Sequence, residues 1–186
     1  MTNDHSTAKT QTPDTLWGNI FGKKNGTAED VRQVLRQVPL FTNMNSGELR
    51  EFEKIIHRRS FKTGETIFWE GEPGVGMYII QHGSVTISKY FSTEERKVLA
   101  MLKAGEFFGE LALLDESPRS ATAIAKEETK ILGLFRPDLF SLLDRKPRLG
   151  SKFLFQLALI IGERLKYTNS EMQKLRAQVD RADLVV

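Results

Sequence analysis

The chain has 186 residues, 27% charged and 40% hydrophobic, a composition typical of a globular protein with one domain and short extensions. It contains no cysteine, which excludes disulfide bonds and thiol chemistry and favours a reducing, cytoplasmic setting. No apolar run reaches the roughly 18 residues of a membrane span, and the polar N-terminus lacks the apolar core of a signal peptide. The net charge is only +3, and the basic residues are scattered along the chain. We interpret them as part of a solvated surface and not as a nucleic-acid site.

Residues 1–26 are rich in Thr, Asn, Asp and Gly and are predicted to form a flexible tail. An apolar segment at 17–21 interrupts this tail and is followed by two lysines. We expect this segment to dock back onto the domain. Docking on a partner or on a membrane surface is the alternative.

A helical segment is predicted at 27–59. Its first helix covers 29–38 and stops at Pro39, because proline disrupts a helix interior. Asn45 and Glu48 have the spacing of a capping box, which opens a second helix. One face of that helix is apolar and is expected to pack on the strand-rich part of the chain that comes next; it carries Leu49, Phe52, Ile55 and Ile56.

Between 60 and 135 the pattern changes to short apolar runs separated by glycines, interrupted only by the segment 105–123. Such a succession of short strands and turns is typical of a jelly roll or barrel. The predicted fold class is therefore mainly β with flanking helices: a jelly-roll β-barrel with N-terminal helices and a long C-terminal helix. The predicted strands lie at 66–69, 77–80, 85–88, 98–102, 121–124 and 130–134.

Within 136–186 we predict a short hinge helix at 138–143, and Pro147 separates it from a long helix that begins near Arg148. About 25 residues of helix reach roughly 38 Å, further than a small barrel extends. We expect the first turns to pack on the domain and the distal part to form a homodimer through 154–179. The a/d heptad seam that predicts this pairing is Leu154, Ala158, Ile161, Leu165, Thr168, Met172, Leu175 and Val179.

Thr168 is the one hydroxyl side chain in this seam, and Asn169 lies beside it. A polar residue at such a position sets the register of a coiled coil in some proteins. It can equally be placed to contact a ligand. Both interpretations stay open.

The segment 105–123 combines the groups that a phosphate and a ribose require. Gly109 lets a ligand approach the backbone, and Glu110 offers a carboxylate that accepts hydrogen bonds. The apolar turn from Leu111 onward presents unpaired N–H groups to an anion. Ten residues after Gly109, Arg119 provides a planar fork of donors for phosphate. The alternative, a Glu110–Arg119 salt bridge in an empty barrel, is disfavoured by the complete spacing of the segment.

This segment resembles the phosphate-binding cassette of cyclic-nucleotide-binding domains at almost every position. Residues from about 38 to 179 are most similar to the regulatory half of the catabolite activator protein family, and the cassette is the most specific part of that resemblance. The other matches are Gly64-Glu65, Glu70-Gly71-Glu72 and Gly83-Ser84-Val85 in the barrel turns, and Arg164-Leu165 leading to Thr168-Asn169 in the long helix.

The resemblance implies a role for each cassette residue. Glu110 is expected to accept a hydrogen bond from the ribose 2′-hydroxyl, and Arg119 to pair with the cyclic phosphate. Backbone N–H groups near Gly109 and Ala112, with the hydroxyl of Ser120, are expected to complete the phosphate shell.

The same resemblance places the base between strands and helix. Ile87 and Leu99 are expected to line it, Thr168 to contact the adenine amino group, and Asn169 to reach it from a second subunit. Asn169 stands where the nearest relatives usually have serine, and a hydroxyl such as that of Ser120 also occurs in guanine-selective members. Thr168 favours cyclic AMP as the ligand, with cyclic GMP second.

The predicted function is that of a stand-alone cyclic-nucleotide sensor, which dimerises and signals to an unidentified protein partner by ligand-dependent helix movement. The activator family continues into a DNA-reading helix-turn-helix, whereas this chain ends at Val186, so we expect no direct DNA binding. A scaffolding protein with a vestigial site, and a cyclic dinucleotide sensor, are the alternatives. The histidines are isolated and no metal-ligand spacing occurs, so neither enzyme activity nor a metal is expected, and His57 is interpreted as a cap or surface residue.

Overall fold

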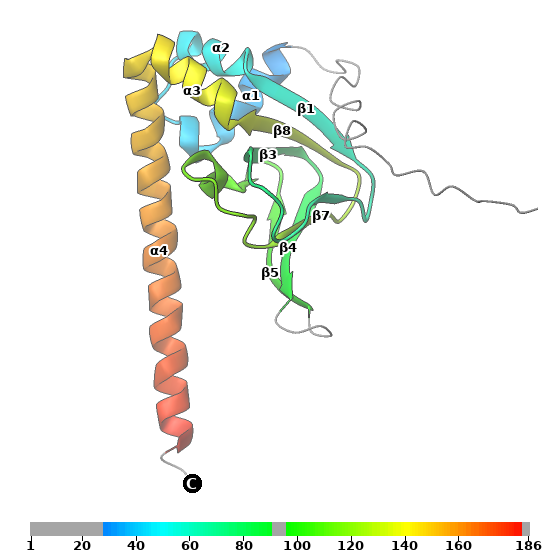
Figure 1. Cartoon of the computed structure of the whole chain (residues 1–186), viewed down its shortest axis with the longest axis vertical. Helices are drawn as coiled ribbons and strands as arrows, with labels where there is room; N and C mark the ends of the chain where they lie inside the picture. Colours follow the sequence, from blue (N-terminus) through cyan, green and yellow to red (C-terminus); the bar gives the residue numbers. More distant parts are fainter. Residues whose placement is uncertain (1–27, 91–95, 184–186) are drawn as a thin grey trace, which may run out of the picture.

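The computed structural model describes residues 28–90 and 96–183, with side chains at 30–90 and 96–178. The predictions for the tail at 1–26, including its apolar segment at 17–21, therefore lie outside the described residues. A cap of short helices covers one end of a rolled pair of β-sheets, and one long helix runs beside both and continues past them (Figure 1).

The N-terminal part of the cap contains α1 (Ala28–Gln37), the short 3-10 helix η2 (Pro39–Phe41) and α2 (Ser46–Glu53). The predicted capping box is confirmed: the Asn45 side chain accepts from the Glu48 N–H at 3.0 Å, and Glu48 accepts from the Asn45 N–H at 2.8 Å. The first predicted helix is confirmed within one residue at each end.

The prediction that Ile55 and Ile56 continue the apolar face of α2 is wrong, although Ile55 is buried. The helix ends at Glu53, and Ile56 begins strand β1 (Ile56–Phe61), so the helical segment stops short of residue 59. This strand is polar in sequence because it lies at the edge of its sheet, where it pairs only with β8 (Thr129–Phe135).

The jelly-roll-like arrangement is confirmed. One sheet has the order β1-β8-β3-β6, with β3 at Gly76–His82 and β6 at Phe107–Phe108. The other has the order β2-β7-β4-β5, with these strands at Thr66–Phe68, Thr122–Ala125, Ser84–Tyr90 and Arg96–Lys103. All pairs are antiparallel, and each of the six predicted strands overlaps an observed one.

Strand β8 separates two hydrophobic clusters, because its side chains alternate between the faces of its sheet. Leu132 and Leu134 belong to the cluster shared with the helical cap, whereas Ile131 belongs to the cluster inside the roll. All three are fully buried. The sheet therefore forms the common wall of both cores, which fixes the helical cap relative to the roll.

The C-terminal helices are α3 (Arg136–Arg145) and α4 (Pro147–Asp183). Proline is favoured in the first turn of a helix, so Pro147 begins α4 just before the predicted start. The first turns of α4 do pack on the domain, but they use Leu149, Phe153 and Leu157, which are buried in the cap cluster.

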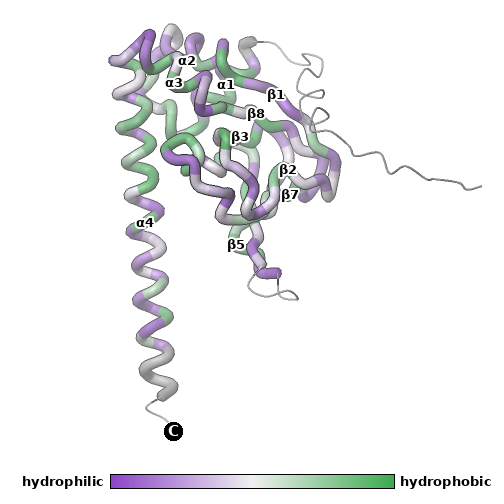
Figure 2. Tube along the Cα trace, in the orientation of Figure 1, coloured by the Kyte–Doolittle hydropathy of each residue, from purple (hydrophilic) through white to green (hydrophobic). Residues whose placement is uncertain are grey.

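Most of the predicted heptad seam lies on a neighbouring face of α4. Ile161 packs against the cap cluster, but Leu154, Leu165 and Leu175 are 40%, 58% and 59% exposed, so the domain leaves most of the seam uncovered. The side chain of Val179 lies beyond the described ones. Apolar residues gather in the half of α4 nearest the cap, and hydrophilic residues become more frequent further along (Figure 2).

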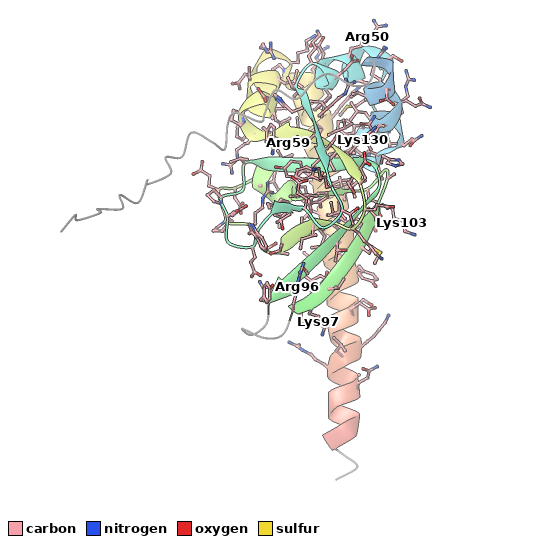
Figure 3. All side chains as sticks on the ribbon, turned by 90° about the vertical axis from the view of Figure 1, so that its right-hand side faces the viewer. Arg50, Arg59, Arg96, Lys97, Lys103 and Lys130 are labelled. Atoms are coloured by element: carbon pink, nitrogen blue, oxygen red, sulfur yellow. The ribbon has the colours of Figure 1, made fainter. Side chains whose placement is uncertain are left out.

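Basic side chains are spread over the surface, as expected. Those labelled in Figure 3 extend from Arg50 in α2, past Arg59 and Lys130 in the first sheet, to Arg96 and Lys97 near the end of the β4–β5 hairpin. None of the described helices is long and apolar enough to cross a membrane.

Phe153 is the anchor that we expect to matter most for stability. Its ring lies 5.1 Å from that of Phe52 and 5.9 Å from that of Phe41, which joins α4 to the cap. Phe153→Ala is predicted to lower the free energy of unfolding by about 3–5 kcal/mol, because a large buried side chain leaves a cavity. Phe155→Ala, at a side chain that is 65% exposed, is the control and should change it by less than about 0.5 kcal/mol. Equal losses in urea titrations of the two variants would contradict this packing.

Candidate functional site

The cassette begins where β6 ends. Gly109 has φ 73° and opens the short 3-10 helix η3 (Glu110–Leu113), which turns the chain away from the sheet. Gly109 is tightly enclosed, because a Cβ at this position would lie 2.6 Å from Nη1 of Arg119. Glycine is therefore required here both for its left-handed backbone and for the room it leaves.

Arg119 is the most unusual side chain of the cassette. The residue is 7% exposed, and its guanidinium lies 4.1 Å from the ring centre of Phe68 and 5.6 Å from that of Tyr78. Nη1 donates to the Gly109 carbonyl at 3.2 Å, but the buried Nε has no hydrogen-bond partner, and within the described chain no carboxylate pairs with the group. Burial lowers the pKa of Arg119 below its ordinary value. The guanidinium thus has no direct carboxylate partner among the described residues, and Glu72 and Glu110 act on it only at longer range.

The main chain of Arg119 is fixed by the turn between β2 and β3. Its N–H donates to the Glu72 carbonyl, and its carbonyl accepts from the Gly71 N–H, both at 2.8 Å. Pro73 and Pro118 form an isolated bridge beside these bonds. The main chain from which the Arg119 side chain extends is therefore held by the β2–β3 turn as well as by the cassette.

Glu110 is also buried, at 7% exposure, and its partner comes from α4. Arg164 donates from Nη1 to the Glu110 carboxylate at 2.5 Å and from Nη2 to the Phe107 carbonyl at 3.3 Å. The Arg164 guanidinium also lies 4.7 Å from the ring centre of Phe107. The alternative of a Glu110–Arg119 salt bridge is wrong, because Glu110 pairs with the long helix instead.

These groups surround one pocket of about 410 Å³ at the mouth of the roll. Of the residues that the sequence assigned to the site, the pocket brings together Gly109, Glu110, Arg119, Ser120 and Ile87. Its remaining walls come from both sheets and from α4: Phe68, Ala100, Leu102, Glu106, Phe107, Phe108, Ala121 and Arg164.

Several assigned residues lie elsewhere. Leu99 is 50% exposed and does not line the pocket; its neighbour Ala100 does, because side chains of β5 alternate between its two faces. Leu111 is 50% exposed, and Ala112 is buried against Gly74, where a Cβ on the glycine would lie 2.7 Å from that of Ala112. Both contribute backbone to η3 but no side chain to the pocket.

Thr168 and Asn169 are exposed on α4 and do not line the pocket. The Thr168 hydroxyl donates to the Arg164 carbonyl at 2.9 Å, one helical turn back. Thr168 thus shares a face of α4 with Arg164, the residue of this helix that does reach the pocket.

Arg164 matches a family helix in the sequence, but its place in the site was not predicted, nor were Phe68 and Tyr78 as the aromatic neighbours of Arg119. The aromatic residues stand out in the sequence, but only strand pairing brings them to one arginine. His57 bonds to Asp138 of α3 at 2.8 Å and so joins β1 to that helix. Within the described part of the chain, no group of acidic residues and histidines has the arrangement of a metal site.

Comparison with known proteins identifies the family to which the chain belongs. Residues 58–146 match the family model of the cyclic nucleotide-binding domain. The N-terminal domain of a transcriptional regulator from Streptomyces coelicolor A3(2) is 32% identical, with a TM-score of 0.65 over 75% of this chain and 94% of that one. The chain belongs to the cyclic nucleotide-binding domain family. A cyclic nucleotide-binding domain from Methylobacillus flagellatus is 26% identical, with a TM-score of 0.69 over 77% of this chain and 81% of that one.

Among curated relatives, the cyclic AMP receptor protein of Thermus thermophilus is 34% identical over 74% of this chain and 62% of its own length. A potassium channel protein of Rhodopseudomonas palustris is 32% identical over 79% of this chain but only 34% of its own length. The chain thus spans less than two thirds of these relatives. Similar domains therefore occur both in a receptor protein and in a potassium channel protein.

The enclosure of Gly109 gives a test of the cassette. Gly109→Ala is predicted to displace the Arg119 guanidinium and to weaken cyclic-nucleotide binding at least about 10-fold, the equivalent of one hydrogen bond to a charged group. Gly105→Ala is the matched control, because Gly105 has φ 87° but no atom within 4 Å of its Cβ position. Both variants carry similar backbone strain, so only a difference between their nucleotide titrations reports on the cassette. Equal affinities would contradict the close approach of Gly109 and Arg119.

Proposed function

We propose that this chain is a sensor that binds a cyclic nucleotide, preferably cyclic AMP, with its phosphate on Arg119. The observation that carries the proposal is the buried guanidinium with an unpartnered Nε and no paired carboxylate within the described residues. A buried charge without a counterion is costly, and an anion in the pocket compensates it. A phosphate accepts two parallel N–H bonds from a guanidinium, and Arg119 lines the pocket in which such a group would bind.

The rest of the pocket supports a ligand with a sugar beside the phosphate. Glu110 presents acceptor oxygens within the same pocket, and the bond from Arg164 holds that carboxylate in place. Ile87, Ala100 and Leu102 provide an apolar wall suited to the faces of a base. A volume of about 410 Å³ falls in the range of small-molecule sites.

The base preference rests on α4. In this proposal Thr168 contacts the adenine amino group and Asn169 does so from a second subunit, which requires α4 to shift or to pair, because both residues lie outside the pocket. Cyclic GMP is the second choice of ligand and a cyclic dinucleotide the third. The relatives include both a cyclic AMP receptor protein and a cGMP-dependent protein kinase of Plasmodium berghei, so the family accommodates either base.

We propose that α4 transmits the effect of ligand binding from the pocket to a protein partner. Its uncovered seam is suited to a second copy of the chain, and the Arg164–Glu110 bond links the same helix to the pocket. Ligand occupancy then changes the preferred position of α4, and a protein partner responds to that change. The uncovered seam equally favours one alternative, a scaffolding protein that assembles through α4 and no longer needs nucleotide.

Calorimetric titration with cyclic AMP and cyclic GMP tests the ligand. Arg119→Ala is predicted to weaken binding about 10- to 100-fold, because charged hydrogen bonds contribute roughly 1.5–3 kcal/mol. Arg145→Ala, an exposed arginine at the end of α3, is the control and should bind as the parent protein does. Affinity unchanged by Arg119→Ala would refute the cassette assignment, and a preference for cyclic GMP would refute the role of Thr168.

Sedimentation of the full chain tests the pairing. Leu165→Glu places a charge in the seam and is predicted to weaken dimerisation at least about 10-fold, because the charge must be desolvated on association. Gln173→Glu adds the same charge off the seam and should leave the dimer intact. A parent protein that sediments as a monomer, with or without cyclic AMP, would contradict the proposed pairing. Dimers that ignore nucleotide would favour the scaffolding alternative.

A further inference from the structure

The guanidinium of Arg136, the first residue of α3, contacts the cassette at several points. Nε donates to the Ala112 carbonyl at 3.0 Å, Nη2 bonds to the Asp115 carbonyl, and Nη1 pairs with Glu116 at 3.0 Å. Nη2 also lies 3.4 Å from the Gly74 carbonyl, in the turn that holds Arg119. The Arg136 side chain is only 15% exposed.

These contacts depend on the shape of arginine. The carbonyls of Ala112 and Asp115 lie at and just beyond the end of η3, where a short helix leaves its last carbonyls unpaired. A planar fork with five N–H donors can satisfy several acceptors at once, whereas lysine presents a single point charge. The Glu116 contact is different, because that side chain is 92% exposed and such pairs contribute little.

The first turn of α3 therefore lies between two anchors. On one side, Arg136 holds the cassette through its side chain, and its own N–H donates to the Val75 carbonyl at 2.9 Å. On the other side, Asp138 accepts from His57 of β1. Only the first of these anchors belongs to the segment that carries Arg119.

The C-terminal end of α3 packs closely against α4. Gly150 is buried, and a Cβ there would lie 2.8 Å from a methyl carbon of Leu143. Such close packing transmits a rigid-body movement of α3 to α4, because a tightly packed contact shifts as a unit.

We propose that Arg136 is the positioning residue through which occupancy of the cassette moves α3. The inference rests on the proposed nucleotide function. It adds the residue that would link the cassette to α3. When a bound anion attracts Arg119, the cassette backbone moves toward the pocket. The carbonyls of Ala112 and Asp115 then move the Arg136 guanidinium with them, and with it the first turn of α3. Without the guanidinium, the pocket still binds nucleotide but α3 no longer follows.

A distance measurement separates this role from a structural one. Because the chain has no cysteine, spin labels can be placed on Glu128→Cys, in the exposed turn before β8, and on Asp144→Cys, on the exposed side of α3. Pulsed electron spin resonance then gives the label separation with and without cyclic AMP. Dilution with unlabelled chain removes distances between subunits.

Three variants in this labelled background complete the experiment. Arg136→Met keeps the apolar stem and removes the fork; it should weaken cyclic AMP binding by no more than about 10-fold, since the loss is one of preorganisation. It should abolish most of the nucleotide-dependent change in separation. Arg136→Lys should restore part of that change, and Glu116→Gln, which alters only the exposed contact, should keep all of it.

The outcomes are distinct. A full change of separation in Arg136→Met would overturn the inference, and so would a loss of affinity as large as that of Arg119→Ala, because Arg136 would then only shape the pocket. A parent protein that binds nucleotide with no change in separation would overturn it as well. A parent protein that binds no cyclic nucleotide contradicts the proposed function itself. Near-ultraviolet circular dichroism of each variant confirms that the fold is retained.

Discussion

The buried, unpaired charge of Arg119 is the constraint on which the site depends. The guanidinium is held by the rings of Phe68 and Tyr78 and by its bond to the Gly109 carbonyl. The β2–β3 turn fixes the main chain of Arg119 through two further hydrogen bonds. The roll thus maintains a positive charge in a low-dielectric pocket, which strengthens its attraction for an anion relative to water.

Glu110 shows how the same pocket keeps two opposite charges from neutralising each other. The carboxylate pairs with Arg164 of α4, so Arg119 stays without a carboxylate partner in the described chain although both residues belong to one cassette. One consequence is that α4 takes part in the site before any ligand arrives. Another is that any change in the hydrogen bonding of Glu110 directly alters its contact with Arg164 of the long helix.

Most of the fold and the centre of the site could be predicted from the sequence, because both depend on local signals. The capping box, the glycine turns and the Gly109–Arg119 spacing are properties of neighbouring residues. Strand β1 was missed because an edge strand with Arg58 and Arg59 lacks an apolar pattern, and Leu99 was chosen over Ala100 because the face of a strand depends on its pairing register. The roles of Arg136 and Phe68 depend on contacts between distant segments, which no local pattern records.

In the proposed function, Thr168 is the residue that would connect binding to assembly. It lies one turn beyond Arg164 on the face of α4 that reaches the pocket, and it also occupies a position of the exposed seam. A helix that pairs through its seam must therefore hold Thr168 at the border between the second copy and the ligand. Because α4 meets the cassette directly at Glu110 and indirectly through Arg136 and α3, a rotation of this helix changes the pocket and the seam together. In the proposed sensor, binding and pairing would therefore be linked by geometry, and a ligand that favours one position of α4 would favour one arrangement of the pair.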